Sequence, residues 1–189
     1  MINQLLNSLA RELDKKKVPY MIIGGQAVLL YGNPRLTRDI DITLGIDSEE
    51  HSKILDIITK LKLRVLVKDE ESFVSKTRVL PCEDTEIHIR VDFIFSFTPY
   101  ESQAIKRAIR VKIDKYNVRF ASKEDVIVHK MFAGRPIDAE DVKGILIRYS
   151  ATIDFDYIIK WLKEFETISK GENLVRKFNN LRKEIGNNK

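Results

Sequence analysis

Residues 20–44, YMIIGGQAVLLYGNPRLTRDIDITL, constrain the fold more than any other part of this 189-residue chain. Residues 21–23 form an apolar run of strand length, which ends at Gly24 and Gly25, two residues that lack a Cβ. A short helix is predicted over residues 26–31, so its free N–H groups and the positive end of its dipole face the two glycines. The sequence therefore predicts a strand, a glycine turn and a helix N-terminus where a phosphate can bind.

The next predicted strand carries two acidic residues. Gly, Asn and Pro at positions 32–34 end the helix, and Asp39 and Asp41 then alternate with Ile40 and Ile42. Alternation in a strand places both carboxylates on one face and both isoleucines on the other. Adjacent carboxylates repel each other, and a divalent metal ion with oxygen ligands is the usual partner that offsets this repulsion.

Several residues of this stretch occur in an order that is typical of one enzyme superfamily. In chain order they are Gly24, Gly25, Arg35, Thr37, Asp39 and Asp41. The set resembles the signature of the DNA polymerase β-type nucleotidyltransferases and is closest to the AbiEii-like and related minimal members. In that superfamily a third carboxylate follows on a later strand, and Asp92, within the alternating segment 89–95, fits this position.

The resemblance implies an enzyme that moves a nucleoside monophosphate from an NTP to an acceptor hydroxyl and releases pyrophosphate. It implies that Asp39, Asp41 and Asp92 are both the catalytic residues and the ligands of two Mg²⁺ ions, with Mn²⁺ as the alternative metal. The acceptor stays open among RNA, including a tRNA end, a protein hydroxyl and a small alcohol such as an aminoglycoside. By analogy, the AbiEii-like resemblance also suggests a cognate partner protein of the toxin–antitoxin kind.

The resemblance extends to a second stretch, residues 121–141. In AbiEii-like enzymes a lysine, an arginine and an acidic pair follow the carboxylate core, and the matching residues here are Lys130, Arg135, Asp138 and Asp141. Lys130 would hold the triphosphate, Arg135 would support it or the acids, and the two aspartates would fix a corner between helices. The predicted nucleotide-binding residues are therefore Gly24, Gly25, Arg35, Thr37, Arg38, Lys130 and Arg135.

Simpler interpretations of the same residues stay open. The glycines can form an ordinary tight turn, and the two carboxylates of the D-x-D motif can lie on a solvated strand face paired with Arg35 or Arg38. Lys130 can extend along the surface to an ion pair at the helix corner. In that case the chain is a non-catalytic nucleotide-binding or toxin–antitoxin interaction protein with the same fold.

Two further side chains on the predicted strand 86–97 share the parity of Asp92. His88 is expected to be solvated or hydrogen-bonded rather than a metal ligand, because Mg²⁺ prefers oxygen. Arg90 can contact phosphate or balance the carboxylates, and the sequence leaves both roles open.

Helices and strands alternate along the first two thirds of the chain, which predicts a mixed α/β sheet. Helices are predicted at 2–13, 47–62 and 99–108, and strands at 64–67, 73–80, 86–97, 109–113 and 117–120. Ser122 is predicted to cap a helix that Gly134 ends, Asp138 to cap the next helix at 139–149, and Gly171 to separate two amphipathic helices. We therefore predict an α/β (α+β) nucleotidyltransferase core at 1–121 and a helical C-terminal subdomain at 122–189 packed on it.

Composition indicates the setting in which the chain acts. It has 33 Lys and Arg against 28 Asp and Glu, a net charge of +5 that favours a polyanionic partner, although the basic residues are spread along the chain. One cysteine, Cys82, excludes an internal disulfide framework and suits a reducing compartment. No segment has the length and apolarity of a signal or transmembrane helix, so a cytoplasmic protein without membrane contact is expected.

Overall fold

The computed structural model describes residues 1–96, 98–169 and 173–186. By its contacts the chain divides into two units. The sheet unit comprises Met1–Gln26 and Thr37–Ala121, and the helical unit comprises Ala27–Leu36 and Ser122–Lys189. The predicted division into 1–121 and 122–189 stays a prediction, and the short segment Ala27–Leu36 groups with the helices.

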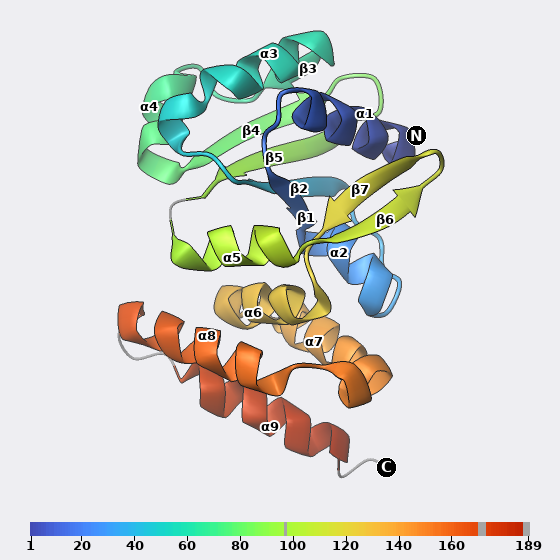
Figure 1. The fold of residues 1–189 in the computed structure, drawn as a ribbon, viewed down its shortest axis with the longest axis vertical. Coiled ribbons are helices and arrows are strands. Elements are labelled where there is room, and N and C mark those ends of the chain that lie inside the picture. The colour runs from blue at the N-terminus through green and yellow to red at the C-terminus, as the bar shows by residue number, and fades with distance from the viewer. Residues whose placement is uncertain (97, 170–172, 187–189) are drawn as a thin grey trace. The chain divides into compact units, whose positions relative to one another are not determined.

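Within the described residues, the sheet unit contains a mixed seven-stranded sheet (Figure 1). Its strands are β1 (Tyr20–Ile23), β2 (Asp39–Leu44), β3 (Leu63–Val65), β4 (Val79–Asp84), β5 (Ile89–Phe95), β6 (Ile109–Ile113) and β7 (Tyr116–Phe120). The order across the sheet is β3-β4-β5-β2-β1-β7-β6. β2 pairs in parallel with β5 and β1 with β7, whereas the other neighbours are antiparallel. The predicted mixed α/β sheet is therefore confirmed.

One face of the two central strands forms the core of the sheet unit. Ile40 and Ile42 on β2 lie in register with Val91 and Phe93 on β5, and all four side chains are fully buried. Because side chains alternate along a strand, the aspartates of β2 and β5 project from the opposite face. The predicted separation of apolar and acidic faces is thus present in both strands.

Helices cover both faces of this sheet. They are α1 (Ile2–Lys15), η1 (Ser48–Glu50), α3 (Ser52–Lys60), α4 (Glu70–Thr77) and α5 (Pro99–Arg107), and α2 (Gly24–Tyr31) begins in this unit. The leucines of α1 are buried, and α1 contacts both β7 and α3. Figure 1 shows α1 and α3 together on one side of the sheet and α5, which contacts β2, on the other.

The predicted strand at 73–80 is wrong in its first part, because α4 occupies residues 70–77. Asp69 caps this helix by accepting a hydrogen bond from a backbone N–H of the first turn, and two glutamates in that turn complement the helix dipole. Arg78 ends the helix in the left-handed conformation, with φ 59°. The acidic residues at 69–71, which lie between two predicted strands, were the signal for a helix start.

The predicted strand at 86–97 is also shorter than expected, since β5 covers only Ile89–Phe95. His88 precedes it with φ 52°, a turn conformation, so it does not share the strand face of Asp92. Its Nδ1 lies 3.7 Å from Oε1 of Glu83 on the surface, as suits a solvated histidine. Phe97, the last residue of the predicted strand, lies outside the described residues.

The helical unit consists of the segment Ala27–Leu36 and the helices of the C-terminal part of the chain. These helices are α6 (Lys123–Ala133), α7 (Pro136–Tyr149), η2 (Ser150–Thr152), α8 (Phe155–Ile168) and α9 (Leu174–Gly186). α6 contacts the other three α-helices, and α8 contacts α9 (Figure 1). Ser122 caps α6 and Gly134 ends it at φ 64°, as predicted. Gly171 lies outside the described residues.

The predicted role of Asp138 as a helix cap is corrected by the structure. α7 begins at Pro136, so its N-cap is Arg135 and Asp138 is the third residue of the first turn. From there the Asp138 carboxylate accepts a hydrogen bond from the backbone N–H of Arg135, at 3.0 Å. The aspartate therefore binds the N–H of the N-cap residue from inside the first turn instead of starting the helix.

Candidate active site

The two glycines of the first motif lie directly against the predicted catalytic side chains. Gly24 has φ 63°, and a Cβ on it would lie 1.8 Å from Oδ2 of Asp41. A Cβ on Gly25 would lie 2.3 Å from Oγ1 of Thr37. Glycine is required at both positions because any other residue would collide with these side chains. The helix α2 begins at Gly24 itself, two residues earlier than predicted.

The three predicted carboxylates project from the same face of two neighbouring strands. Asp41 on β2 is the register partner of Asp92 on β5, and Asp39 is the partner of Arg90. Register partners in a sheet project from the same face, so Asp92 lies on the same face of the sheet as the D-x-D motif. Asp39 is exposed, and Asp41 and Asp92 are partly buried.

Arg90 is the residue whose role the sequence left open, and the structure places it on the carboxylates. Its Nε donates to both oxygens of Asp92, at 2.9 and 3.0 Å. This hydrogen bond raises the pKa of Arg90, and the negative charges of Asp92, Asp41 and Asp39 raise it further. The guanidinium is thus an electrostatic partner of the whole carboxylate cluster, and its shared parity with Asp92 was the signal for this role.

The three aspartates have the donor atoms that a divalent metal needs, but their positions in this structure do not form a complete metal site. Carboxylate oxygens are the donors that Mg²⁺ and Mn²⁺ prefer, and a guanidinium cation already lies against Asp92. However, no three His, Cys, Asp or Glu side chains of the described chain are placed to hold a metal ion together. The three aspartates that were predicted as metal ligands are therefore not close enough together to hold one ion in this structure, and Arg90 competes with a metal for Asp92.

Short polar contacts fix the position of Asp39. Thr37 donates from Oγ1 to Oδ1 of Asp39 at 2.6 Å, and Gln26 donates from Nε2 to its backbone carbonyl at 3.3 Å. Arg38 is exposed, and its carbonyl accepts the backbone N–H of Arg90 at 3.3 Å. Gln26 was not among the predicted site residues, and only its position at the start of α2 could have indicated it.

The remaining predicted residues lie in the helical unit and form a buried ion-pair network. Nζ of Lys130 lies 2.7 Å from Oδ1 of Asp138 and 2.8 Å from Oδ2 of Asp141. Arg135 binds Asp138 from Nε at 2.8 Å, and Arg35 donates to both oxygens of Asp141 at 3.1 and 3.3 Å. Lys130 is only 4% exposed and Asp138 only 1%. The two aspartates do fix the corner between α6 and α7, as the resemblance implied.

The neighbouring cations favour the charged form of Asp138. Burial by itself raises the pKa of Asp138, but hydrogen bonds from Arg135 and Lys130 outweigh it and hold the pKa below its ordinary value. Arg135 has a 65% exposed side chain, and with Lys130 it borders a surface hollow of about 300 Å³. Lys177 and Asn180 of α9 line the same hollow. Of the predicted nucleotide-binding residues in this unit, Arg135 is therefore the one most open to a ligand.

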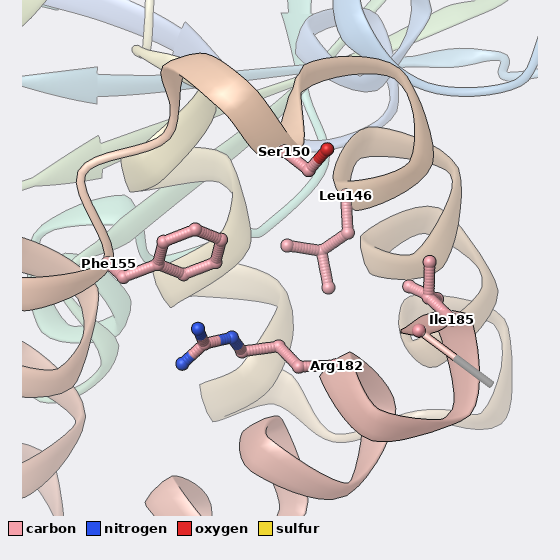
Figure 2. Close-up of a pocket in the computed structure, with 6 residues that line it drawn as sticks. Leu146, Ser150, Phe155, Arg182 and Ile185 are labelled. Carbon is pink, nitrogen blue, oxygen red and sulfur yellow. The ribbon is translucent and has the colours of Figure 1, made fainter. Parts of the chain in front are cut away.

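A second cavity in the helical unit contains none of the predicted residues. It measures about 140 Å³ and is lined by Leu146, Ser150, Phe155, Arg182, Ile185 and Gly186 (Figure 2). The guanidinium of Arg182 lies over the ring of Phe155, 3.9 Å from its centroid. This hollow is lined by residues of α7, η2, α8 and α9 and contains no carboxylate of the D-x-D motif.

Comparison with protein families gives one match that spans nearly the whole chain. The family is described as nucleotidyltransferase of unknown function (DUF6036), and it matches residues 1–187. No curated protein sequence matches the chain. No helix among the described residues has the length and apolarity needed to cross a membrane.

Solved structures with similar folds have low sequence identity to the chain. The antibiotic-resistance factor ANT(2'')-Ia has TM-score 0.60 and 16% identity, covering 88% of this chain and 92% of its own. A nucleotidyltransferase-like antigen from Paracoccidioides brasiliensis has TM-score 0.55 and 15% identity, covering 94% and 91%. The nucleotidyltransferase toxin MenT4 from Mycobacterium tuberculosis has TM-score 0.51 and 13% identity, covering 89% and 65%. These matches confirm the fold class.

Proposed function

The chain belongs to this nucleotidyltransferase family, and from that premise we propose that it transfers a nucleoside monophosphate from an NTP to an acceptor hydroxyl. The hydroxyl oxygen forms a bond to the α-phosphorus, the bond from that phosphorus to the bridging oxygen breaks, and pyrophosphate leaves. The observation that carries the proposal is the register of Asp41 with Asp92, with the Asp41 carboxylate against Gly24. The acidic cluster on the adjacent strands β2 and β5 therefore lies beside the N-terminus of helix α2.

We assign the catalytic role to Asp39, Asp41 and Asp92, and the same residues would hold Mg²⁺ or Mn²⁺. The metal would neutralise the triphosphate charge and lower the pKa of the acceptor hydroxyl. Asp92 would accept the proton of that hydroxyl, for which its carboxylate must first be released by Arg90. The Arg90 side chain is 56% exposed, so it has room to move toward solvent.

The phosphate-binding residues follow from their positions. The backbone N–H groups of Gly24 and Gly25 open helix α2 and would donate to phosphate oxygens. Thr37 would hold Asp39, to which it already donates, and Arg38, which is exposed, would contact the nucleotide. Lys130 and Arg135 border a hollow and would supply positive charge to a phosphate, with Arg135 the more accessible. Arg35, bound to Asp141, would act mainly by fixing the segment that precedes Thr37.

The acceptor is proposed as a class only. One similar structure shows ANT(2'')-Ia in complex with adenylyl-2''-tobramycin, which favours a small alcohol. It has TM-score 0.53 and 16% identity and covers 96% of this chain and 97% of its own. MenT4 is described as a toxin, which keeps an RNA or protein hydroxyl and a cognate partner protein among the proposals. A cytoplasmic location is proposed because the NTP donor is found there, whichever acceptor is used.

The second candidate is a nucleotide-binding or interaction protein without transfer activity. The observation that favours it is the ion pair between Arg90 and Asp92, which neutralises one of the three acids. Incubation with each α-³²P-labelled NTP, Mg²⁺ or Mn²⁺, and separate RNA, protein and aminoglycoside acceptors distinguishes the two. Label transferred to an acceptor, and lost in the Asp41→Asn variant, supports the enzyme. Nucleotide binding without transfer to any acceptor class supports the second candidate.

A further inference from the structure

One short segment of the chain carries a net positive charge as large as that of the whole chain. Residues 106–119 contain six of the 33 basic residues and one of the 28 acidic residues, a net charge of +5. The rest of the chain contains 27 of each and is neutral. Basic residues are therefore spread along the sequence, as expected, and outside this segment acidic residues equal them in number. This segment covers the end of α5, the edge strand β6 and its partner β7.

Four of these cations are exposed and have no acidic partner in the described part of the chain. They are Lys106, Arg110, Lys112 and Lys115. In contrast, Nη2 of Arg119 lies 3.2 Å from Oδ1 of Asp14. Long basic side chains without an acid nearby raise the local positive potential, which attracts polyanions.

Strand pairing adds to the charge density on this hairpin. Arg110 is the register partner of Arg119, and Lys112 is the partner of Asn117. Like charges directly opposite each other destabilise a sheet. The ion pair of Arg119 with Asp14 offsets this repulsion, and of the two arginines it is the exposed Arg110 that is left to meet an anion.

Neither aromatic residue of the hairpin offers a free ring, because Phe120 is buried and Tyr116 is already engaged. Tyr116 donates its hydroxyl to Oδ2 of Asp14 at 2.8 Å, and the guanidinium of Arg11 lies 5.1 Å from its ring centroid. A ring held in this way is not a free platform for base stacking. Recognition at this surface would therefore depend on charge and not on base identity.

We propose that the hairpin β6–β7, with Lys106 at the end of α5, binds the phosphodiester backbone of a nucleic acid without sequence preference. Side chains at alternate positions of an edge strand project at regular intervals along one face. Basic side chains spaced in this way can contact successive phosphates of a linear polyanion. Among the residues that the structure describes, no strand pairs with the outer edge of β6, so this surface lies at the border of the sheet. The proposal goes beyond nucleotide transfer, since binding needs neither metal nor NTP.

The test compares two fourfold variants of the full chain with equal loss of charge. The hairpin variant is Lys106→Gln, Arg110→Gln, Lys112→Gln and Lys115→Gln. The control is Lys17→Gln, Lys62→Gln, Lys68→Gln and Lys76→Gln, four exposed lysines elsewhere in the sheet unit. Fluorescence anisotropy measures binding of labelled RNA and DNA, each single-stranded and duplex, between about 50 and 200 mM KCl.

We expect the hairpin variant to bind at least tenfold more weakly than the control. Each lost phosphate contact reduces the slope of log K against log salt concentration by about 0.7–0.9, so four contacts reduce it by about 3. The RNA and DNA arms show which nucleic acid is preferred. Lys115→Glu, in the turn between the strands, is a second variant that leaves both ladders intact and should weaken binding by itself.

Several results would overturn the proposal. Equal weakening in both variants would mean that only total charge matters, and unchanged binding in the hairpin variant would exclude this surface. Competition by polyglutamate as strong as by RNA would indicate an acidic protein partner. If the hairpin variant self-associates while its monomer binds nucleic acid normally, the cations serve to protect an exposed sheet edge.

Discussion

At the scale of single residues, the glycines and carboxylates of the site depend on each other. Gly24→Ala would place a methyl group within 1.8 Å of Asp41 at a position with φ 63°. The left-handed conformation alone costs about 1–2 kcal/mol for a residue with a Cβ. We expect a clear loss of stability and a displaced Asp41, measured by urea denaturation and by transfer activity. Gly186→Ala is the matched control, since nothing lies within 4 Å of its Cβ position, and it should cause no loss.

Asp41→Asn separates a metal-binding role from a structural one. The substitution removes one charge from the cluster with Asp39 and Asp92, so we expect the free energy of unfolding to stay within about 0.5 kcal/mol or to rise. Transfer activity should fall by orders of magnitude, because charge stabilisation at the reacting phosphate is lost. An early melting temperature with activity retained would mean that Asp41 is a structural ion-pair residue.

Arg90→Gln tests whether the guanidinium competes with a metal for Asp92. The ion pair is partly exposed, so its loss should change stability by less than about 1 kcal/mol. We expect Mn²⁺ to bind the Arg90→Gln variant two- to fivefold more tightly than the wild type, a difference of about 0.5–1 kcal/mol in binding free energy. Isothermal titration calorimetry measures this difference. Arg90→Lys keeps the charge and should behave more like the wild type. Weaker Mn²⁺ binding in Arg90→Gln would show that Arg90 assists the metal site.

At the scale of helices and strands, local sequence patterns correctly predicted the elements that depend on residues close together in the chain. The alternation of Asp39 to Ile42 correctly predicted β2 and its two faces, and the segment 89–95 did the same for β5. The helix α4 was missed because Phe73 and Val74 resemble a strand, whereas Asp69 and the left-handed Arg78 delimit a helix. Capping depends on single polar residues at the ends of an element, and periodicity does not detect them.

Contacts between residues far apart in the chain could not be predicted from local sequence patterns. The sequence left Lys130 open between the triphosphate and an ion pair at the helix corner, and in the structure its ammonium binds Asp138 and Asp141 one helix away. The spacing of 8 residues between Lys130 and Asp138 becomes a contact only because Gly134 turns the chain. The bond between Arg35 and Asp141 joins residues 106 positions apart, which no local pattern indicates. Ion pairs of this kind follow from packing.

Asp138→Asn tests this network within α6 and α7. Leaving Lys130 and Arg135 without one carboxylate should cost about 3–5 kcal/mol at neutral pH. Because the pKa of Asp138 is lowered on folding, its stabilisation is fully present above the unfolded value of about 3.9 and is lost as the pH falls through the folded value. Urea denaturation should therefore show a weaker acid dependence for the variant than for the wild type. Glu140→Gln, an exposed acid of the same helix, should change neither quantity.

At the scale of the whole molecule, ligand binding distinguishes an enzyme from an interaction protein that kept the fold. A ligand that binds only the folded state stabilises it by about 2.7 kcal/mol at a hundredfold excess over its Kd. For a chain of 150–250 residues this corresponds to a rise in Tm of roughly 5–10 °C. We expect this rise with Mg²⁺ and the preferred NTP together, and a much smaller rise with either alone. Asp41→Asn should abolish the joint effect, whereas Glu140→Gln should retain it. A rise of equal size with NTP alone, unchanged in Asp41→Asn, would mean that the chain binds nucleotide without using its carboxylates, and nucleotide transfer at this site would then be refuted.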